Sequence, residues 1–196
     1  MTGGDYAVDI VMTVFMIFGV YQFYFWCQRN ALTGPRELST SLDDQIQFRP
    51  GWVWIYSGLY YPLIVFANFC IGSPREFGRV AMSYISLLFA QMFLFTVFPV
   101  ATPEHWRHYH PRRGLSERFL AFVHAYDGRS NCFPSMHTSV AMLTALHMYG
   151  HIGPWAWIFP LLISASCLYT KQHYVVDVPA GAALGWAAYR FYAFIR

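Results

Sequence analysis

The chain has 196 residues, of which 56% are hydrophobic, 20% are aromatic and only 12% are charged, and its formal net charge is +3. Ordinary soluble domains carry about 25% charged residues, so a soluble protein of this composition could not cover its apolar surface. We therefore expect one membrane-embedded domain, residues 1–196, and the small net charge gives no indication of a nucleic-acid partner.

Six apolar segments each approach the length of about 20 residues that a helix needs to cross a bilayer. In chain order, the expected spans are 8–28, 52–72, 77–100, 135–151, 154–171 and 176–195. The first lacks a basic flank and a small-residue cleavage site, so we expect a retained helix rather than a signal peptide. The expected fold class is an all-α integral membrane protein with six transmembrane helices. Short interfacial helices are expected in the two long connections, around 38–48 and at 116–122.

A first candidate site sequence, FPSMH, occupies residues 133–137 at the start of the fourth expected span. Pro134 favours the first turn of a helix. The peptide N–H groups that follow, with the Ser135 hydroxyl, would form an anion site at the positive end of the helix dipole. His137 would lie within the same turn. Taken alone, the sequence also fits a span that merely starts with proline and carries an interfacial histidine.

A second candidate site sequence, TKQHYVVD, occupies residues 170–177 between the fifth and sixth expected spans. His173 and Asp177 are four residues apart, which places them on one face if the segment is helical. A carboxylate on one imidazole nitrogen fixes the tautomer and leaves the other nitrogen as nucleophile or base. A simple N-cap role is the alternative for Asp177. Because six spans alternate between two faces, this segment and His137 are expected on the same face, as one phosphoryl-transfer site requires.

Together, F-P-S-x-H and the later H-x-x-x-D resemble the type-2 phosphatidic acid phosphatase superfamily. Further matches at 44–50, 53–56 and 98–103 resemble its inositolphosphotransferase-like branch, which includes inositol phosphorylceramide synthase. The resemblance covers about residues 43–190. It implies a six-helix enzyme that cleaves lipid phosphate esters through a phosphohistidine, with no metal and no other cofactor.

The resemblance also implies roles for individual residues. His173 would attack phosphorus, held by Asp177, while His137 would protonate the leaving oxygen and then activate the incoming hydroxyl. Ser135 and nearby N–H groups would bind the nonbridging oxygens. The chain lacks the K-x6-R-P sequence and the arginine before the second histidine that are typical of the phosphatase branch, so other cations must bind the phosphate. The candidates are Lys171, Arg107, Arg112, Arg113 and Arg129.

The acceptor of the phosphoryl group is expected to be water, because the compact chain shows no dedicated region for a second substrate. This makes a lipid phosphate phosphatase the leading interpretation. A phosphodiester needs fewer cations than a phosphomonoester, so transfer of a phosphorylated headgroup to a lipid hydroxyl is the close alternative. A non-enzymatic transporter or membrane scaffold, with the histidines as proton-relay or structural residues, is a more distant one.

Two arguments place the face with the two histidine sequences on opposite sides of the membrane. Most basic residues lie on the face of the two histidine sequences, which by the positive-inside rule indicates the cytoplasm. The family resemblance implies an extracytoplasmic or lumenal site. Because cations that bind phosphate would inflate the basic count, we expect the second orientation.

The remaining histidines and cysteines predict no metal site. His147 and His151 have helical metal-ligand spacing but no acidic partner, and His105, His108 and His110 are expected to be interfacial side chains. Four widely spaced cysteines without a C-x-x-C pair argue against a disulfide framework or a zinc ribbon. They are Cys27, Cys70, Cys132 and Cys167.

Overall fold

The computed structural model of the protein describes residues 1–108 and 114–196. Within these two ranges the regular elements are helices and there is no β-strand, apart from an isolated bridge between Arg36 and Val100. The expected all-α class is therefore confirmed for the described part of the chain.

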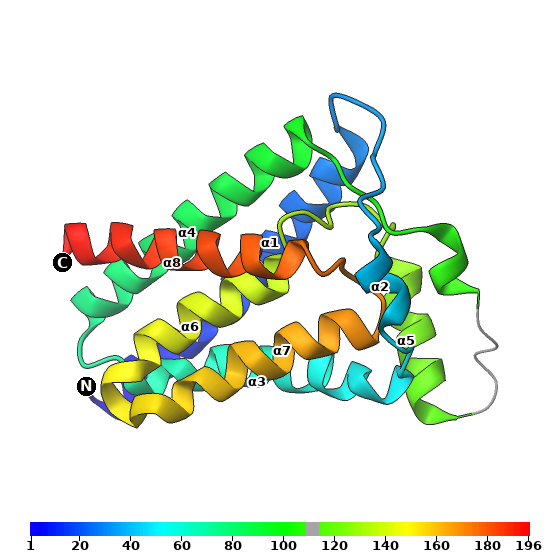
Figure 1. Ribbon diagram of the computed structural model, residues 1–196. Helices are drawn as coiled ribbons and strands as arrows, with labels where there is room; N and C mark the ends of the chain where they lie inside the picture. The colour runs from blue at the N-terminus through cyan, green and yellow to red at the C-terminus, as the bar shows by residue number, and fades with distance from the viewer. Residues whose placement is uncertain (109–113) are drawn as a thin grey trace.

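The first half forms three long helical rods and one short helix (Figure 1). The rods are α1 (Gly3–Arg29), a composite rod (Pro50–Cys70) and α4 (Pro74–Val97), and the short helix is α2 (Ser41–Gln45). The composite rod consists of η1 (Pro50–Trp52), the π-helical η2 (Trp54–Leu59), α3 (Tyr60–Phe66) and η3 (Ala67–Cys70). The surface helix expected around 38–48 is thus limited to the five residues of α2.

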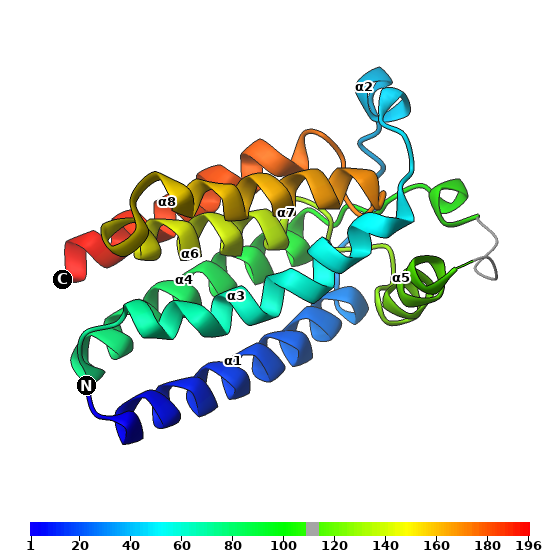
Figure 2. The ribbon, with the colours of Figure 1, turned by 90° about the horizontal axis from the view of Figure 1, so that it is seen from below.

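The described part of the second half contains four α-helices and two short 3₁₀ helices. The elements are η4 (Glu104–Arg107), α5 (Leu115–Tyr126), α6 (Met136–Ile152), η5 (Gly153–Trp157), α7 (Ile158–Tyr169) and α8 (Asp177–Ile195). The interfacial helix expected at 116–122 falls inside α5. Figures 1 and 2 show α6 and α7 side by side and antiparallel, joined by η5.

Four stretches are long and apolar enough to cross a membrane, which is consistent with an integral membrane protein. They are Gly3–Arg29, Pro50–Cys70, Pro74–Val97 and Met136–Tyr169. The last stretch folds back on itself as α6, η5 and α7, and α7 alone has only 12 residues. Six membrane crossings therefore remain a prediction.

Local sequence explains where several helices begin. Thr2 accepts a hydrogen bond from the Asp5 N–H, and Asp5 bonds back to the Thr2 backbone, which is a capping box at α1. Ser73 accepts from the Glu76 N–H at 3.2 Å at the start of α4. Ser135 similarly caps α6. These side chains satisfy N–H groups that have no partner inside their own helix.

Helices α6 and α8 approach closely because glycines lie at their contact. A Cβ atom at Gly181 would lie 2.5 Å from the Ser135 carbonyl oxygen, and one at Gly185 would lie 2.2 Å from that of Ser139. No side chain fits at such distances, so the two backbones meet only because these positions are glycine. The contact joins the two N-termini, where the Ser135 N–H donates to the Asp177 carbonyl at 3.1 Å.

The two candidate site sequences therefore lie at one end of the helix bundle. The start of α6, the end of α7 and the start of α8 meet there, with α2 and α5 nearby (Figures 1 and 2). The two chain termini lie at the opposite end (Figure 1).

Candidate active site

His173 follows α7, and Asp177 begins α8. The Nδ1 atom of His173 lies 3.2 Å from Oδ2 of Asp177 and 2.9 Å from the carbonyl oxygen of Cys132. Both neighbours can only accept, so Nδ1 carries the proton and donates to them. The lone pair of the imidazole is consequently on Nε2. This is the tautomer that a nucleophilic histidine requires.

The Asp177 carboxylate is fully buried and held on more than one side. Its Oδ2 accepts from the Tyr174 N–H at 2.9 Å in addition to His173. Val176, and not Asp177, is the N-cap of α8, and no side chain caps this helix. Asp177 therefore orients His173, and it also places a negative charge in the first turn of α8, where the helix dipole favours it.

His137 faces His173 from the first turn of α6. The ring centroids of the two histidines are 6.1 Å apart. Tyr56 stacks on His137 with 4.1 Å between ring centroids, and Tyr60 packs on it at 4.6 Å. The Nε2 atom of His137 is buried and has no hydrogen-bond partner among the described residues. A nitrogen held by aromatic rings and left unpaired is available to exchange a proton with a bound ligand.

Both histidine segments lie within a range of the chain that matches a known family. Residues 32–191 match the family model of the PAP2 superfamily. The chain belongs to the PAP2 superfamily. Members of the superfamily are generally phosphatases or phosphotransferases. No curated protein matches the chain significantly. The inositolphosphotransferase-like branch remains an expectation from the sequence.

In this PAP2 protein, the expected phosphate-binding residue Arg107 lies close to the loop that contains His173 (the histidine loop). Its guanidinium, however, is hydrogen-bonded to other groups. Its guanidinium binds the main-chain oxygen of Asp127 and donates to the Asp127 carboxylate at 3.1 Å. It also donates to Oε1 of Gln172 at 3.5 Å. Arg107 therefore orients Gln172, the residue directly before His173.

Two other expected cations, Lys171 and Arg129, also have partners other than the histidines. Nζ of Lys171 donates to the Asp43 carbonyl at 2.5 Å and lies 4.8 Å from the centre of the Trp106 ring. Arg129 lies 3.8 Å from Glu104. The two further candidates, Arg112 and Arg113, fall outside the described residues.

Ser135 has a structural partner instead of a free hydroxyl. Its Oγ accepts from the Thr138 N–H at 3.3 Å and the residue is fully buried. Met136 and His137 line the adjoining cavity, whereas Ser135 does not. The predicted anion site at the start of α6 is thus limited to the N–H groups that Ser135 does not cap.

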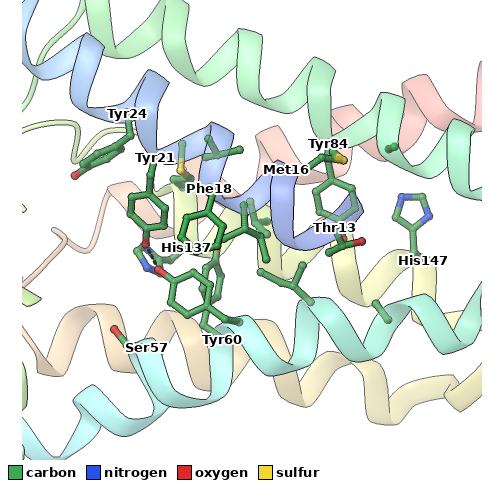
Figure 3. Close-up of a pocket in the computed structure, with 18 of the residues that line it drawn as sticks. Thr13, Met16, Phe18, Tyr21, Tyr24, Ser57, Tyr60, Tyr84, His137 and His147 are labelled. Atoms are coloured by element: carbon green, nitrogen blue, oxygen red, sulfur yellow. Dashed lines mark hydrogen bonds between the residues drawn. The ribbon is translucent and has the colours of Figure 1, made fainter. Parts of the chain in front are cut away.

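Both histidines line a cavity of about 890 Å³. Figure 3 shows His137 at one end of this cavity, close to Tyr21, Ser57 and Tyr60. None of the three described cationic candidates lines it. Two other buried polar atoms do: Nε2 of Gln172 and Oδ1 of Asn131, which have no hydrogen-bond partner in the described ranges. A buried unpaired polar atom costs about 1–3 kcal/mol, so a ligand that pairs with them recovers that energy.

Asp43 is a positioning residue that the sequence analysis did not identify. Its Oδ1 accepts from the Val175 N–H at 2.7 Å, inside the loop that joins His173 to Asp177. Its Oδ2 accepts from the N–H and hydroxyl of Thr40 at 2.7 and 2.8 Å. The T-x-x-D spacing of a capping box could have indicated the second contact. Only the fold brings Asp43 to the histidine loop.

Cys132 contributes its carbonyl oxygen to the site but not its thiol. Burial, together with the charges of Asp127 and Asp177, raises the pKa of the Cys132 thiol well above its ordinary value. The thiolate is the nucleophilic form of cysteine, so this group stays protonated and does not compete with His173.

His147 lies far along α6 from His137 and is part of an aromatic cluster. Its Nε2 lies 3.0 Å from the Ser83 hydroxyl, and its ring packs on Tyr189 and Tyr192. These contacts explain a half-buried histidine in α6 through hydrogen bonding and packing.

Proposed function

We propose that the protein is a membrane-embedded phosphatase that acts on a phosphate-bearing lipid through a phosphohistidine on His173. The observation that carries this proposal is the donation by His173 Nδ1 to Asp177 and Cys132, which leaves Nε2 unprotonated beside His137. The family supports the reaction class, since its members are generally phosphatases or phosphotransferases.

In the first step, Nε2 of His173 attacks phosphorus as the bond between phosphorus and the lipid oxygen breaks. The leaving oxygen takes a proton from His137, which enters the step as an imidazolium. A bound phosphate stabilises that protonated form, because an opposite charge within a few ångströms favours the charged state. Asp177 stabilises the positive charge that develops on His173.

In the second step, His137 is neutral and accepts a proton from water as the water oxygen attacks the phosphohistidine. The bond between phosphorus and Nε2 breaks, inorganic phosphate leaves, and His137 is again protonated. One histidine thus acts first as general acid and then as general base. The nonbridging oxygens are stabilised by the N–H groups at the start of α6 and by the unpaired amide of Gln172.

Rapid-quench labelling tests this mechanism directly. Purified protein in detergent is mixed with a lipid phosphate labelled with ³²P, and the denatured protein is digested and its labelled peptide identified. We expect label on the peptide that contains His173, with no label in the His173→Ala variant. Full turnover by a folded His173→Ala variant would contradict the proposal, and so would label on another residue.

Transfer of a phosphorylated headgroup to a lipid hydroxyl is the second candidate. It is favoured by the observation that Arg107, Arg129 and Lys171 all lie outside the cavity lining. A phosphodiester carries one negative charge where a phosphomonoester carries up to two, so it requires fewer cations. Incubation with a lipid phosphate or a phospholipid, each with and without a lipid alcohol, separates the candidates. Free phosphate supports hydrolysis and a new phospholipid supports transfer, whereas a protein inert in every mixture supports a transporter or scaffold.

The site is proposed to face the extracytoplasmic or lumenal side of the membrane. Glu104 is exposed at the histidine end of the bundle and so offers a position for a reporter cysteine. The Glu104→Cys variant is made in a background whose four native cysteines are replaced. It should react with a membrane-impermeant maleimide added to intact cells, or to sealed microsomes whose lumenal side faces outward. Labelling only after permeabilisation from the cytoplasmic side would reverse the orientation.

A further inference from the structure

The cavity that contains the two histidines continues far beyond them. It passes between α1, the composite rod, α4 and α6, and reaches His147 and Tyr84 toward the other end of the bundle (Figure 3). Phosphoryl transfer uses only the end near His137 and His173. The rest of the volume is therefore available to another part of the substrate.

Helix α1 forms one wall of this cavity and lies outside the region that matches the PAP2 superfamily, residues 32–191. Of its 27 residues only Asp9 and Cys27 are buried. Its cavity-lining side chains include Thr13, Met16, Phe18, Tyr21 and Tyr24 (Figure 3). This wall is thus formed by a segment outside the matched range.

The length of the cavity corresponds to one membrane leaflet. His137 and His147 are ten residues apart on α6, which is about 15 Å of helix at roughly 1.5 Å per residue. The hydrocarbon core of a bilayer is about 30 Å thick, so one leaflet contributes about half of that. A lipid whose phosphate lies at the histidines would extend its chain over this distance.

The chemistry of the lining changes along the cavity. Unpaired polar atoms occur at the histidine end, on Gln172 and Asn131. The middle is lined by Met16, Ile64 and Val140. This arrangement of a polar end and an apolar middle fits a molecule with a charged head and a hydrocarbon chain.

Two polar side chains toward the deep end, those of His147 and Tyr84, already have partners. His147 pairs with Ser83 at 3.0 Å, and the Tyr84 hydroxyl pairs with that of Thr144 at 2.8 Å. A hydrocarbon chain that covers these side chains would leave no polar group newly unpaired, so it would incur no such cost.

We propose that this cavity binds the hydrocarbon chain of the phosphate-bearing substrate, with α1 as its outer wall, and that it selects substrates by chain length. This inference rests on the proposed function for the position of the phosphate. The occupant is a chain about as long as one leaflet is thick, and a short chain leaves the deep part of the cavity empty.

Chain-length profiles of two matched variants test the proposal. Ala81 lines the deep part of the cavity, whereas Ala187 on α8 is exposed on the outside of the bundle. Phosphate release is measured for lysophosphatidic acids with octanoyl to stearoyl chains. Displacing about two methylenes from the cavity costs about tenfold in kcat/KM. We expect Ala81→Phe to lower the ratio of stearoyl to octanoyl kcat/KM about tenfold and Ala187→Phe to leave that ratio unchanged. Equal ratios in both variants would overturn the proposal.

Photo-crosslinking tests the cavity without relying on turnover or on a folded Ala81→Phe variant. A lysophosphatidic acid with a diazirine at the end of its acyl chain is irradiated with the wild-type protein and with His173→Ala. We expect adducts on cavity residues of α1 and α4, such as Met16 and Ala81. Adducts confined to exposed outer residues, such as Phe89 and Phe93, would overturn the proposal. Cavity adducts in a protein without phosphatase or transferase activity would refute the proposed function but not chain binding.

Discussion

Nδ1 of His173 lies 3.2 Å from Oδ2 of Asp177, and the same carboxylate oxygen accepts from the Tyr174 N–H at 2.9 Å. The carboxylate thereby fixes both the imidazole and the turn that carries it. Because the Asp177 side chain is fully buried, its charge acts on His173 with little screening by water.

Replacing Asp177 by Asn should leave a folded protein with greatly reduced turnover. The amide has a similar shape but no charge to stabilise the cationic imidazole, so we expect a loss in kcat of about two to four orders of magnitude. The ³²P-labelled His173 peptide should fall in parallel with kcat. An unchanged kcat in Asp177→Asn would show that the carboxylate is only a structural element of the loop.

The effect of replacing His137 should depend on the leaving group of the substrate. His137→Ala removes the general acid, and we expect kcat for an alkyl phosphate to fall about 10²–10⁴-fold. An aryl phosphate with an acidic phenol as leaving group should still label His173, because its departure needs no proton. Loss of labelling with both substrates would place His137 in binding instead of proton transfer.

Gln172 and Arg107 should act as one unit, since Arg107 donates to the Gln172 amide oxygen at 3.5 Å. A hydrogen bond from the Gln172 amide to a charged phosphate oxygen contributes about 1.5–3 kcal/mol, so Gln172→Ala should lower kcat/KM about tenfold or more. Arg107→Met should lower it similarly, and the double variant little further. Arg129→Met is the control, because that side chain is 37% exposed and pairs only weakly with Glu104. Additive losses in a double-mutant cycle would refute the coupling.

Asp43→Ala should lower both the stability of the protein and its kcat. The substitution leaves the Val175 N–H unpaired in a mostly buried loop, a cost of about 1–3 kcal/mol in the free energy of unfolding. We expect a lower melting temperature in detergent and a reduced kcat with KM nearly unchanged, because the change acts through His173. Asp44→Ala, at the exposed neighbouring position, should alter neither. A wild-type kcat in folded Asp43→Ala would contradict this role.

Gly185→Ala should loosen the contact between α6 and α8. The added methyl group would lie 2.2 Å from the Ser139 carbonyl oxygen, and overpacking of this kind costs about 1–3 kcal/mol. The melting temperature and kcat should both fall. Gly19→Ala is the matched control, because nothing lies within 4 Å of a Cβ at that helical position. It should be neutral or slightly stabilising, and equal effects of the two changes would disprove the close-contact role of Gly185.

The sequence by itself determined the helical class, the approximate ends of the helices and the two histidine segments. Hydrophobic runs reflect a property of neighbouring residues, so they can be read from the sequence directly. The caps Thr2 and Ser73, which the prediction did not use, start α1 and α4 a few residues before the expected spans. The family resemblance was likewise carried by short motifs around His137 and His173, and the superfamily match agrees with it.

Only the tertiary structure decided which side chains surround those histidines. Tyr56, Tyr60 and Asp43 reach the site from segments about 80 or more residues away in sequence from the histidines that they contact or support, and their spacing carries no signal of that contact. Lys171 was a reasonable phosphate ligand by composition, yet its ammonium donates to the Asp43 carbonyl. The physical reason is that a long cation takes whichever acceptor the fold brings nearest. The close contact of α6 with α8 at Gly181 and Gly185 likewise forms only in the folded chain, and it brings the starts of those two helices together.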